Sequence, residues 1–94
     1  MAIAHDARPK LARKASLRHD RFEGKDILLY PERGLSLNAV GSAVCRRCDG
    51  THTVAEIVEA VGATFLDAPR TDVERDVLFF LERLRERGLL EGVG

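Results

Sequence analysis

The sequence has few aromatic residues, few cysteines and no long apolar run. Its 94 residues include no Trp, one Tyr and four Phe, so aliphatic side chains must fill most of the core of what is expected to be one small domain. The absence of an apolar stretch long enough for a membrane span or an export signal predicts a cytoplasmic protein with no membrane partner. No Gly-rich phosphate loop, GxSxG or HExxH motif occurs, so the sequence predicts a protein that is not an enzyme.

The net charge is zero, but the charges are unevenly distributed along the chain. Residues 1–21 carry six basic and two acidic side chains, a net of +4 that the rest of the chain offsets. A basic arm on an acidic body fits either an acidic partner or a solvated tail. We expect residues 1–8 to be a flexible tail and residues 9–94 to form a single domain.

Three short extended runs are expected in the first half of the chain, near residues 16–22, 26–30 and 34–37. Glu23-Gly24 is typical of a tight hairpin, because Gly accepts a positive φ without steric cost. Pro31 presets φ for a second turn, and we expect Gly34 to take the left-handed conformation there. These signals predict a three-stranded antiparallel meander.

Helical patterns follow in the second half. Thr53-Val-Ala-Glu56 and Thr71-Asp-Val-Glu74 each have the spacing of a capping box, in which the Thr and Glu side chains satisfy each other's backbone donors. They predict a second and a third helix, and Gly88 is expected to end the third. The predicted fold class is α+β, a three-stranded antiparallel sheet followed by a three-helix bundle, winged-helix-like.

Both cysteines lie near the end of the first expected helix, which Asn38 caps and Gly50 terminates. A redox pair with the spacing of Cys45 and Cys48 normally uses a helix N-terminus, whose partial positive charge lowers the thiol pKa. With His52 they supply three metal ligands, whereas a closed zinc site needs four. We therefore expect no metal and no cofactor, and interpret the cysteines as small apolar core residues.

The third strand is expected to form an edge of the sheet. It lacks the Lys, Pro or inward charge that usually protects such an edge from pairing with another chain. Leu35 and Leu37 are expected to face the helices and Ser36 to face outward. The edge could accept an extended peptide as a fourth strand, or a helix, a loop or a second protomer could cover it.

Phe79 is a second candidate for binding. On a helix it points about 160° away from the apolar stripe that contains Val77 and Phe80. Beside an open edge strand it could form the other wall of a groove, in which Arg83 could pair with a peptide carboxylate.

Two other functions fit the predicted fold. A winged-helix DNA-binding protein needs a basic recognition face, whereas the second helix offers Glu56 and Glu59 and no basic residue, so no nucleic acid partner is expected. A homodimer that pairs through the edge strand is the other alternative.

Three stretches of the sequence resemble the PqqD family, in the same order and at the family's spacing: LLYPERGLSLN, CDGTHTVAEIV and DVLFFLERLRERGLL. The resemblance extends from about Pro9 to Leu90. The turn and strand of the first stretch and the helix junction of the second are together fairly specific.

The resemblance implies a non-catalytic peptide chaperone in the biosynthesis of pyrroloquinoline quinone (PQQ), related to domains that recognise leader sequences of ribosomally made, modified peptides. In the family the precursor peptide PqqA docks between the third strand and the third helix. The complex presents it to PqqE, a radical S-adenosylmethionine enzyme that joins a Glu to a Tyr within the peptide. Carried onto this chain, the peptide-binding residues are Leu35, Ser36, Leu37, Asn38, Asp76, Phe79, Phe80 and Arg83.

Overall fold

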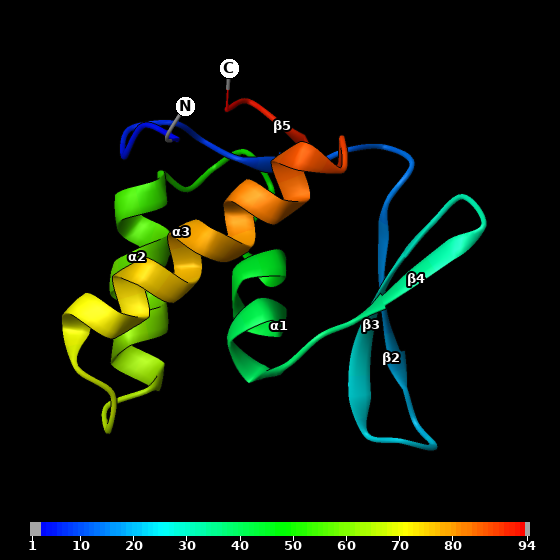
Figure 1. The fold of residues 1–94 in the computed structure, drawn as a ribbon, viewed down its shortest axis with the longest axis horizontal. Coiled ribbons are helices and arrows are strands. Elements are labelled where there is room, and N and C mark those ends of the chain that lie inside the picture. Colours follow the sequence, from blue (N-terminus) through cyan, green and yellow to red (C-terminus); the bar gives the residue numbers. More distant parts are fainter. Residues whose placement is uncertain (1–2, 94) are drawn as a thin grey trace.

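The computed structural model describes residues 3–93, and it confirms the predicted α+β fold (Figure 1). The elements are β1 (Lys10–Leu11), β2 (Ser16–Asp20), β3 (Lys25–Tyr30), β4 (Arg33–Ser36), α1 (Ala39–Arg46), α2 (Val54–Thr64), α3 (Arg70–Glu86) and β5 (Leu90–Glu91). The three helices lie together on one side of the β2–β3–β4 sheet, and the two ends of the chain run side by side as the β1–β5 pair. No helix within residues 3–93 is long and apolar enough to cross a membrane.

The main sheet is an antiparallel meander in the order β2–β3–β4, as predicted. Its central strand places Leu28 opposite Leu17 in β2 and Leu35 in β4. Strand β2 is two residues shorter than expected. The Asp20 carboxylate accepts a hydrogen bond from the Phe22 backbone N–H at 2.9 Å and so begins the turn early.

The prediction that Gly34 takes the left-handed conformation was wrong. Glu32 does so, with φ of 62°, after Pro31 in a two-residue turn that Tyr30 and Arg33 close as a pair. Proline followed by a residue of positive φ is the pattern of a type II turn, in which Gly is usual but not required. Gly34 already lies within β4.

The caps of the first two helices are as predicted, and the cap of the third differs. The Asn38 side chain accepts a hydrogen bond from the Gly41 N–H at 2.8 Å, and Thr53 and Glu56 form the full capping box. Helix α3, however, begins at Arg70 with Pro69 at its N-cap position and no side-chain cap, so the predicted Thr71 capping box was wrong. The Pro69 carbonyl already accepts the N–H groups of the first turn, which places Thr71 inside the helix.

The helix ends also differ in part from expectation. Helix α1 ends at Arg46, so Cys48 lies in the following turn, where Gly50 has φ of 83°. Helix α3 ends as predicted, because Gly88 adopts φ of 71° and the last carbonyls accept the N–H groups of Gly88 and Leu89.

The core has two parts, and three half-buried residues pack against both: Leu11, Phe80 and Leu90. The three helices enclose one cluster, and the sheet packs on α1 and α3 around the other, formed by Leu28, Leu37, Cys45, Leu84 and Leu89. Cys45 and Cys48 are buried in this core, as predicted, and burial raises the pKa of each thiol to about 12.

The N-terminal segment, which we expected to be a tail, lies against the helices from Ile3 onward. Ile3 is buried, and the carbonyls of His5 and Ala7 accept the N–H groups of Ala55 and Val54 at the start of α2. Backbone acceptors thus supplement the capping box. Met1 and Ala2, the rest of the expected tail, lie outside the described residues.

A buried carboxylate joins the sheet to α1. Asp26 accepts hydrogen bonds from Ser42, from His19 at 2.8 Å and from Arg46 at 2.7 Å. The hydrogen bonds from Ser42 and His19 and the charge of Arg46 hold the pKa of Asp26 below its usual value, although burial opposes them.

This carboxylate makes folding stability depend on acid pH. Because the pKa of Asp26 is lower in the folded than in the unfolded state, its contribution is complete above the unfolded value, about pH 4, and is lost as pH falls through the folded value. We expect Asp26→Asn to destabilise the protein at pH 7, and the difference from wild type to shrink as the pH falls below about 4. Urea unfolding at several pH values measures this. Asp67→Asn, which removes an exposed loop carboxylate, is the control, and an equal effect of both variants at every pH would contradict the account.

Candidate functional site

Strand β4 forms an edge of the sheet, as predicted, and the backbone of two of its residues faces away from β3. The Leu37 N–H donates to the Asp26 carbonyl at 3.0 Å, and β3 pairs with Leu35 two residues earlier. Because residues of an antiparallel strand alternate between facing their partner and facing away, Gly34 and Ser36 direct their N–H and C=O groups outward. No other strand within residues 3–93 pairs with this side of β4.

The side chains of this segment alternate as expected. Leu37 is buried and Leu35 is half-buried, and both contact the cluster under the sheet, whereas Ser36 is exposed. The segment is therefore anchored through its leucines while the outward backbone groups of its edge remain unpaired.

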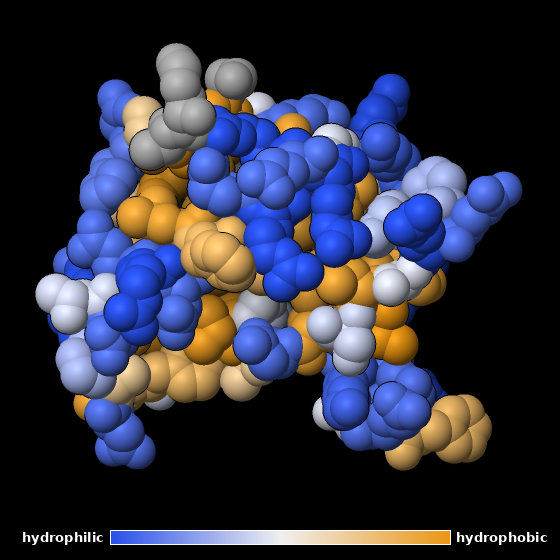
Figure 2. Space-filling view, viewed as in Figure 1, coloured by the Kyte–Doolittle hydropathy of each residue, from blue (hydrophilic) through white to orange (hydrophobic). Residues whose placement is uncertain are grey.

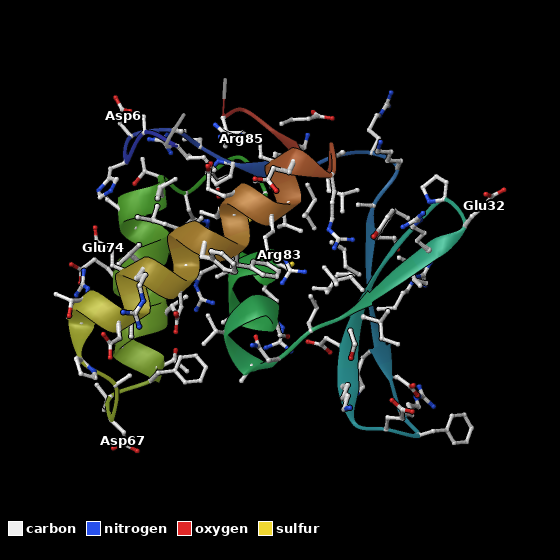
Figure 3. All side chains as sticks on the ribbon, in the orientation of Figure 1. Asp6, Glu32, Asp67, Glu74, Arg83 and Arg85 are labelled. Carbon is white, nitrogen blue, oxygen red and sulfur yellow. The ribbon has the colours of Figure 1, made fainter. Side chains whose placement is uncertain are left out.

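A hollow of about 250 Å³ lies between the start of α1 and the middle of α3. Its lining includes all four predicted helix residues and the last predicted strand residue: Asn38, Asp76, Phe79, Phe80 and Arg83. Phe79 is 65% exposed, in agreement with its predicted direction. Arg83 projects from α3 in the central part of the molecule (Figure 3), and hydrophobic surface is visible between α3 and the sheet (Figure 2).

The charges at the hollow leave one cation available. Asp76 lies 3.9 Å from Arg75, which also approaches Asp72. The guanidinium of Arg83 has no ion-pair partner within residues 3–93. A carboxylate of a bound molecule could therefore pair with Arg83 without displacing an existing partner.

The floor of the hollow depends on Gly41, which the sequence reasoning did not assign to the site. A Cβ at this position would lie 3.1 Å from Cε1 of Phe80 and 3.2 Å from Oδ1 of Asn38. A side chain at position 41 would therefore require the Phe80 ring or the Asn38 side chain to shift by a few tenths of an ångström. The sequence did contain a signal for this role. A glycine within a helix lowers helix stability by about 1 kcal/mol relative to Ala, so its presence indicates that a neighbouring group needs the space.

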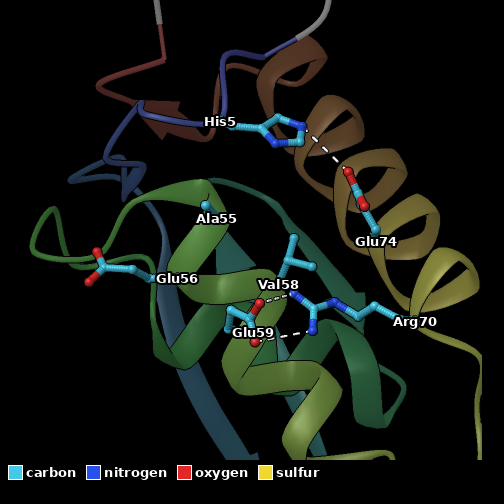
Figure 4. Close-up of a pocket in the computed structure, with 7 residues that line it drawn as sticks. All are labelled: His5, Ala55, Glu56, Val58, Glu59, Arg70 and Glu74. Atoms are coloured by element: carbon cyan, nitrogen blue, oxygen red, sulfur yellow. Dashed lines mark hydrogen bonds and ion pairs between the residues drawn. The ribbon is translucent and has the colours of Figure 1, made fainter.

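A second hollow, of about 200 Å³, lies between the N-terminal segment, α2 and the first half of α3 (Figure 4). None of the predicted site residues lines it. Arg70 binds Glu59 through both terminal guanidinium nitrogens, and His5 lies 3.6 Å from Glu74. The first contact joins α3 to α2, and the second brings the N-terminal segment to α3.

The residues needed for a metal centre do not come together. Within residues 3–93, no group of three or more His, Cys, Asp or Glu side chains could hold a metal ion. His52 lies near Asp49 and Thr51 at the surface, while both cysteines are buried.

Comparisons with known proteins agree on one family. The model of the family described as "Coenzyme PQQ synthesis protein D (PqqD)" matches residues 27–90. A "PqqA binding protein" of Xanthomonas oryzae pv. oryzae (strain KACC10331 / KXO85) is 36% identical over 89 residues, which cover 95% of this chain and 96% of the relative.

Two solved structures share both the fold and substantial sequence identity. The PqqD truncation of Methylobacterium extorquens PqqCD, solved by NMR as a stand-alone recognition element for ribosomally synthesised and modified peptides, has a TM-score of 0.78 and 36% identity, covering 96% of this chain and 95% of that one. TbiB1 in complex with the TbiA(beta) leader peptide has a TM-score of 0.74 and 30% identity, covering 90% of this chain and 98% of that one.

The role of Gly41 can be tested by replacing two helical glycines with alanine. At Gly62 a Cβ would meet only the Arg70 side chain, at 3.5 Å or more, so Gly62→Ala should stabilise the protein by up to about 1 kcal/mol. At Gly41 the same gain in helix propensity is opposed by the contacts with Phe80 and Asn38, so Gly41→Ala should give no gain or a loss. Urea unfolding compares the two. Equal stabilisation by both substitutions would show that the close approach of Phe80 is unimportant.

Proposed function

The chain belongs to the PqqD family, and from this premise we propose that it is a non-catalytic chaperone that binds the PqqA precursor peptide by strand addition to β4 and presents it to the radical S-adenosylmethionine enzyme PqqE. The observation that carries the proposal is that the unpaired edge strand β4 ends two residues before Asn38, which lines the same hollow as Phe79 and Arg83. The relatives named for PqqA binding and the structural neighbour that holds a leader peptide support a peptide as the occupant.

Binding would use backbone and side chains for different purposes. An extended peptide would pair with the outward N–H and C=O groups of Gly34 and Ser36, which gives affinity that depends little on sequence. Side chains directed toward α3 would cover Phe79 and enter the hollow, where Arg83 can pair with a carboxylate. These contacts offset the cost of ordering a flexible peptide, about 2–5 kcal/mol.

Presentation to the enzyme would act through effective concentration. A peptide held along β4 keeps its remaining residues near an enzyme bound to the same domain, so the modification step becomes effectively intramolecular. All six basic side chains of residues 1–21 are exposed, and we propose them as the contact with an acidic surface of the enzyme.

A chaperone role without catalysis agrees with the chemistry of the site. The hollow holds one carboxylate and one guanidinium beside aromatic and aliphatic groups. Both thiols are buried, and with a pKa near 12 they are protonated at neutral pH, which makes them poor nucleophiles.

An NMR titration of labelled protein with PqqA tests the proposal. Saturable amide shifts should be largest in β4 and α3, with the outward-facing Gly34 and Ser36 among the largest. Shifts on β2 in place of β4 would contradict strand addition at this edge. A concentration-dependent dimer that buries β4 in the absence of peptide would identify a second protomer as the occupant.

The aromatic wall can be tested separately by calorimetry. Phe79→Ala should weaken PqqA binding about tenfold, because a partly exposed ring that the peptide would bury is lost. Phe22→Ala is the matched control, since Phe22 is a fully exposed phenylalanine at the β2–β3 turn. An equal loss in both variants would rule out a specific role for Phe79.

A further inference from the structure

The outer face of the sheet, which points away from the helices, carries two apolar side chains from β3. Leu29 is 42% exposed and Ile27 is half-buried. The strand register places Leu29 between Ser16 of β2 and Gly34 of β4. On a sheet with one solvated face, outward positions are normally polar, so this apolar pair needs an explanation.

Gly34 leaves the apolar pair open toward the free edge. A Cβ at this position would lie 3.3 Å from Cδ2 of Leu29 and 3.4 Å from Cγ2 of Ile27. The Leu29 and Ile27 side chains thus extend to the space that a side chain at Gly34 would occupy. Because Gly34 has no positive φ and lies within β4, the space it leaves open, not the turn, accounts for a glycine here.

A peptide added to β4 would bring a side chain to this point. A fourth strand lies about 4.8 Å from β4, and residues opposite each other in a sheet project from the same face. The peptide residue opposite Gly34 therefore projects from the outer face in any register. Its Cβ lies about 5 Å from the position a Gly34 Cβ would occupy, so a large apolar side chain reaches Leu29 across the glycine.

We propose that Ile27 and Leu29 form an outer apolar subsite, reached across Gly34, that binds the side chain of the peptide residue opposite Gly34. This inference rests on the proposed function and extends it. The adjacent peptide residues project from the other face, toward Phe79, Phe80 and Arg83. The chain is thus built to select an extended segment with consecutive apolar residues, which has contacts on both faces of the new strand, over a segment that alternates apolar and polar residues.

The test compares two leucine-to-threonine substitutions. Leu29→Thr removes the subsite at a position where Thr suits a strand, and Leu66→Thr makes the same change at an exposed leucine in the α2–α3 loop. We expect Leu29→Thr to weaken PqqA binding roughly tenfold, as measured by calorimetry. Leu66→Thr should leave the affinity unchanged, and the Gly34 and Ser36 amides should still shift on saturation in both variants.

The outcomes separate this inference from the function on which it rests. If Leu29→Thr binds with wild-type affinity while the Gly34 and Ser36 amides shift, the outer subsite is wrong and strand addition stands. If those amides do not shift in the wild-type protein, both ideas fail. Should Leu29→Thr not fold, the wild-type complex decides the question: nuclear Overhauser effects between the Leu29 methyls and an apolar peptide side chain support the subsite, and their absence in the saturated complex overturns it.

Discussion

The contact between the Phe80 ring and the backbone of α1 at Gly41 is the constraint on which the rest of the arrangement depends. At this contact α3 approaches α1 closely enough that even a Cβ would be crowded, and the same ring packs against both parts of the core. Leu84 of α3 also shares the cluster under the sheet with Leu37, and Leu35 of β4 packs against that cluster. A bulkier residue at position 41 would displace the Phe80 ring, which lines the hollow.

The proposed strand addition also requires that the edge of β4 be well ordered and still unpaired. An open edge strand is a risk for aggregation, and most proteins protect it. Here the turn at Pro31 and Glu32 fixes one end of β4, the Asn38 cap fixes the other, and the Asp26 network ties the sheet to α1. Only the outward groups of Gly34 and Ser36 remain for a partner. An edge ordered in advance lowers the entropy cost that binding must overcome.

Much of this fold was predictable from the sequence because its signals are local. Asn38, the Thr53–Glu56 box and Gly88 mark helix ends through contacts between residues close in the sequence, and Val77 of the predicted apolar stripe is buried. The errors at Gly34 and Thr71 were also local, because Glu32 takes the positive φ of the turn and α3 begins at Arg70. What the sequence reasoning missed altogether lies where longer-range contacts decide. Strands β1 and β5 have two residues each and no periodicity, so only their pairing reveals them. The burial of Ile3 is likewise set by tertiary packing.

The predicted binding residues stay a prediction, but the structure does bring five of them together. Asn38, Asp76, Phe79, Phe80 and Arg83 do border one hollow. The use of Gly41 under Phe80, and of Gly34 beside Leu29, follows from distances between segments that no spacing in the sequence encodes.

Amide hydrogen exchange in β4, with and without PqqA, would test the central claim most directly. The Leu35 and Leu37 amides face β3 and should be protected in both states. If a peptide adds to the edge, exchange at Gly34 and Ser36 should slow on binding, so that every second amide along the strand gains protection. A uniform gain in protection along β4, or a gain confined to β2, would contradict strand addition at this edge.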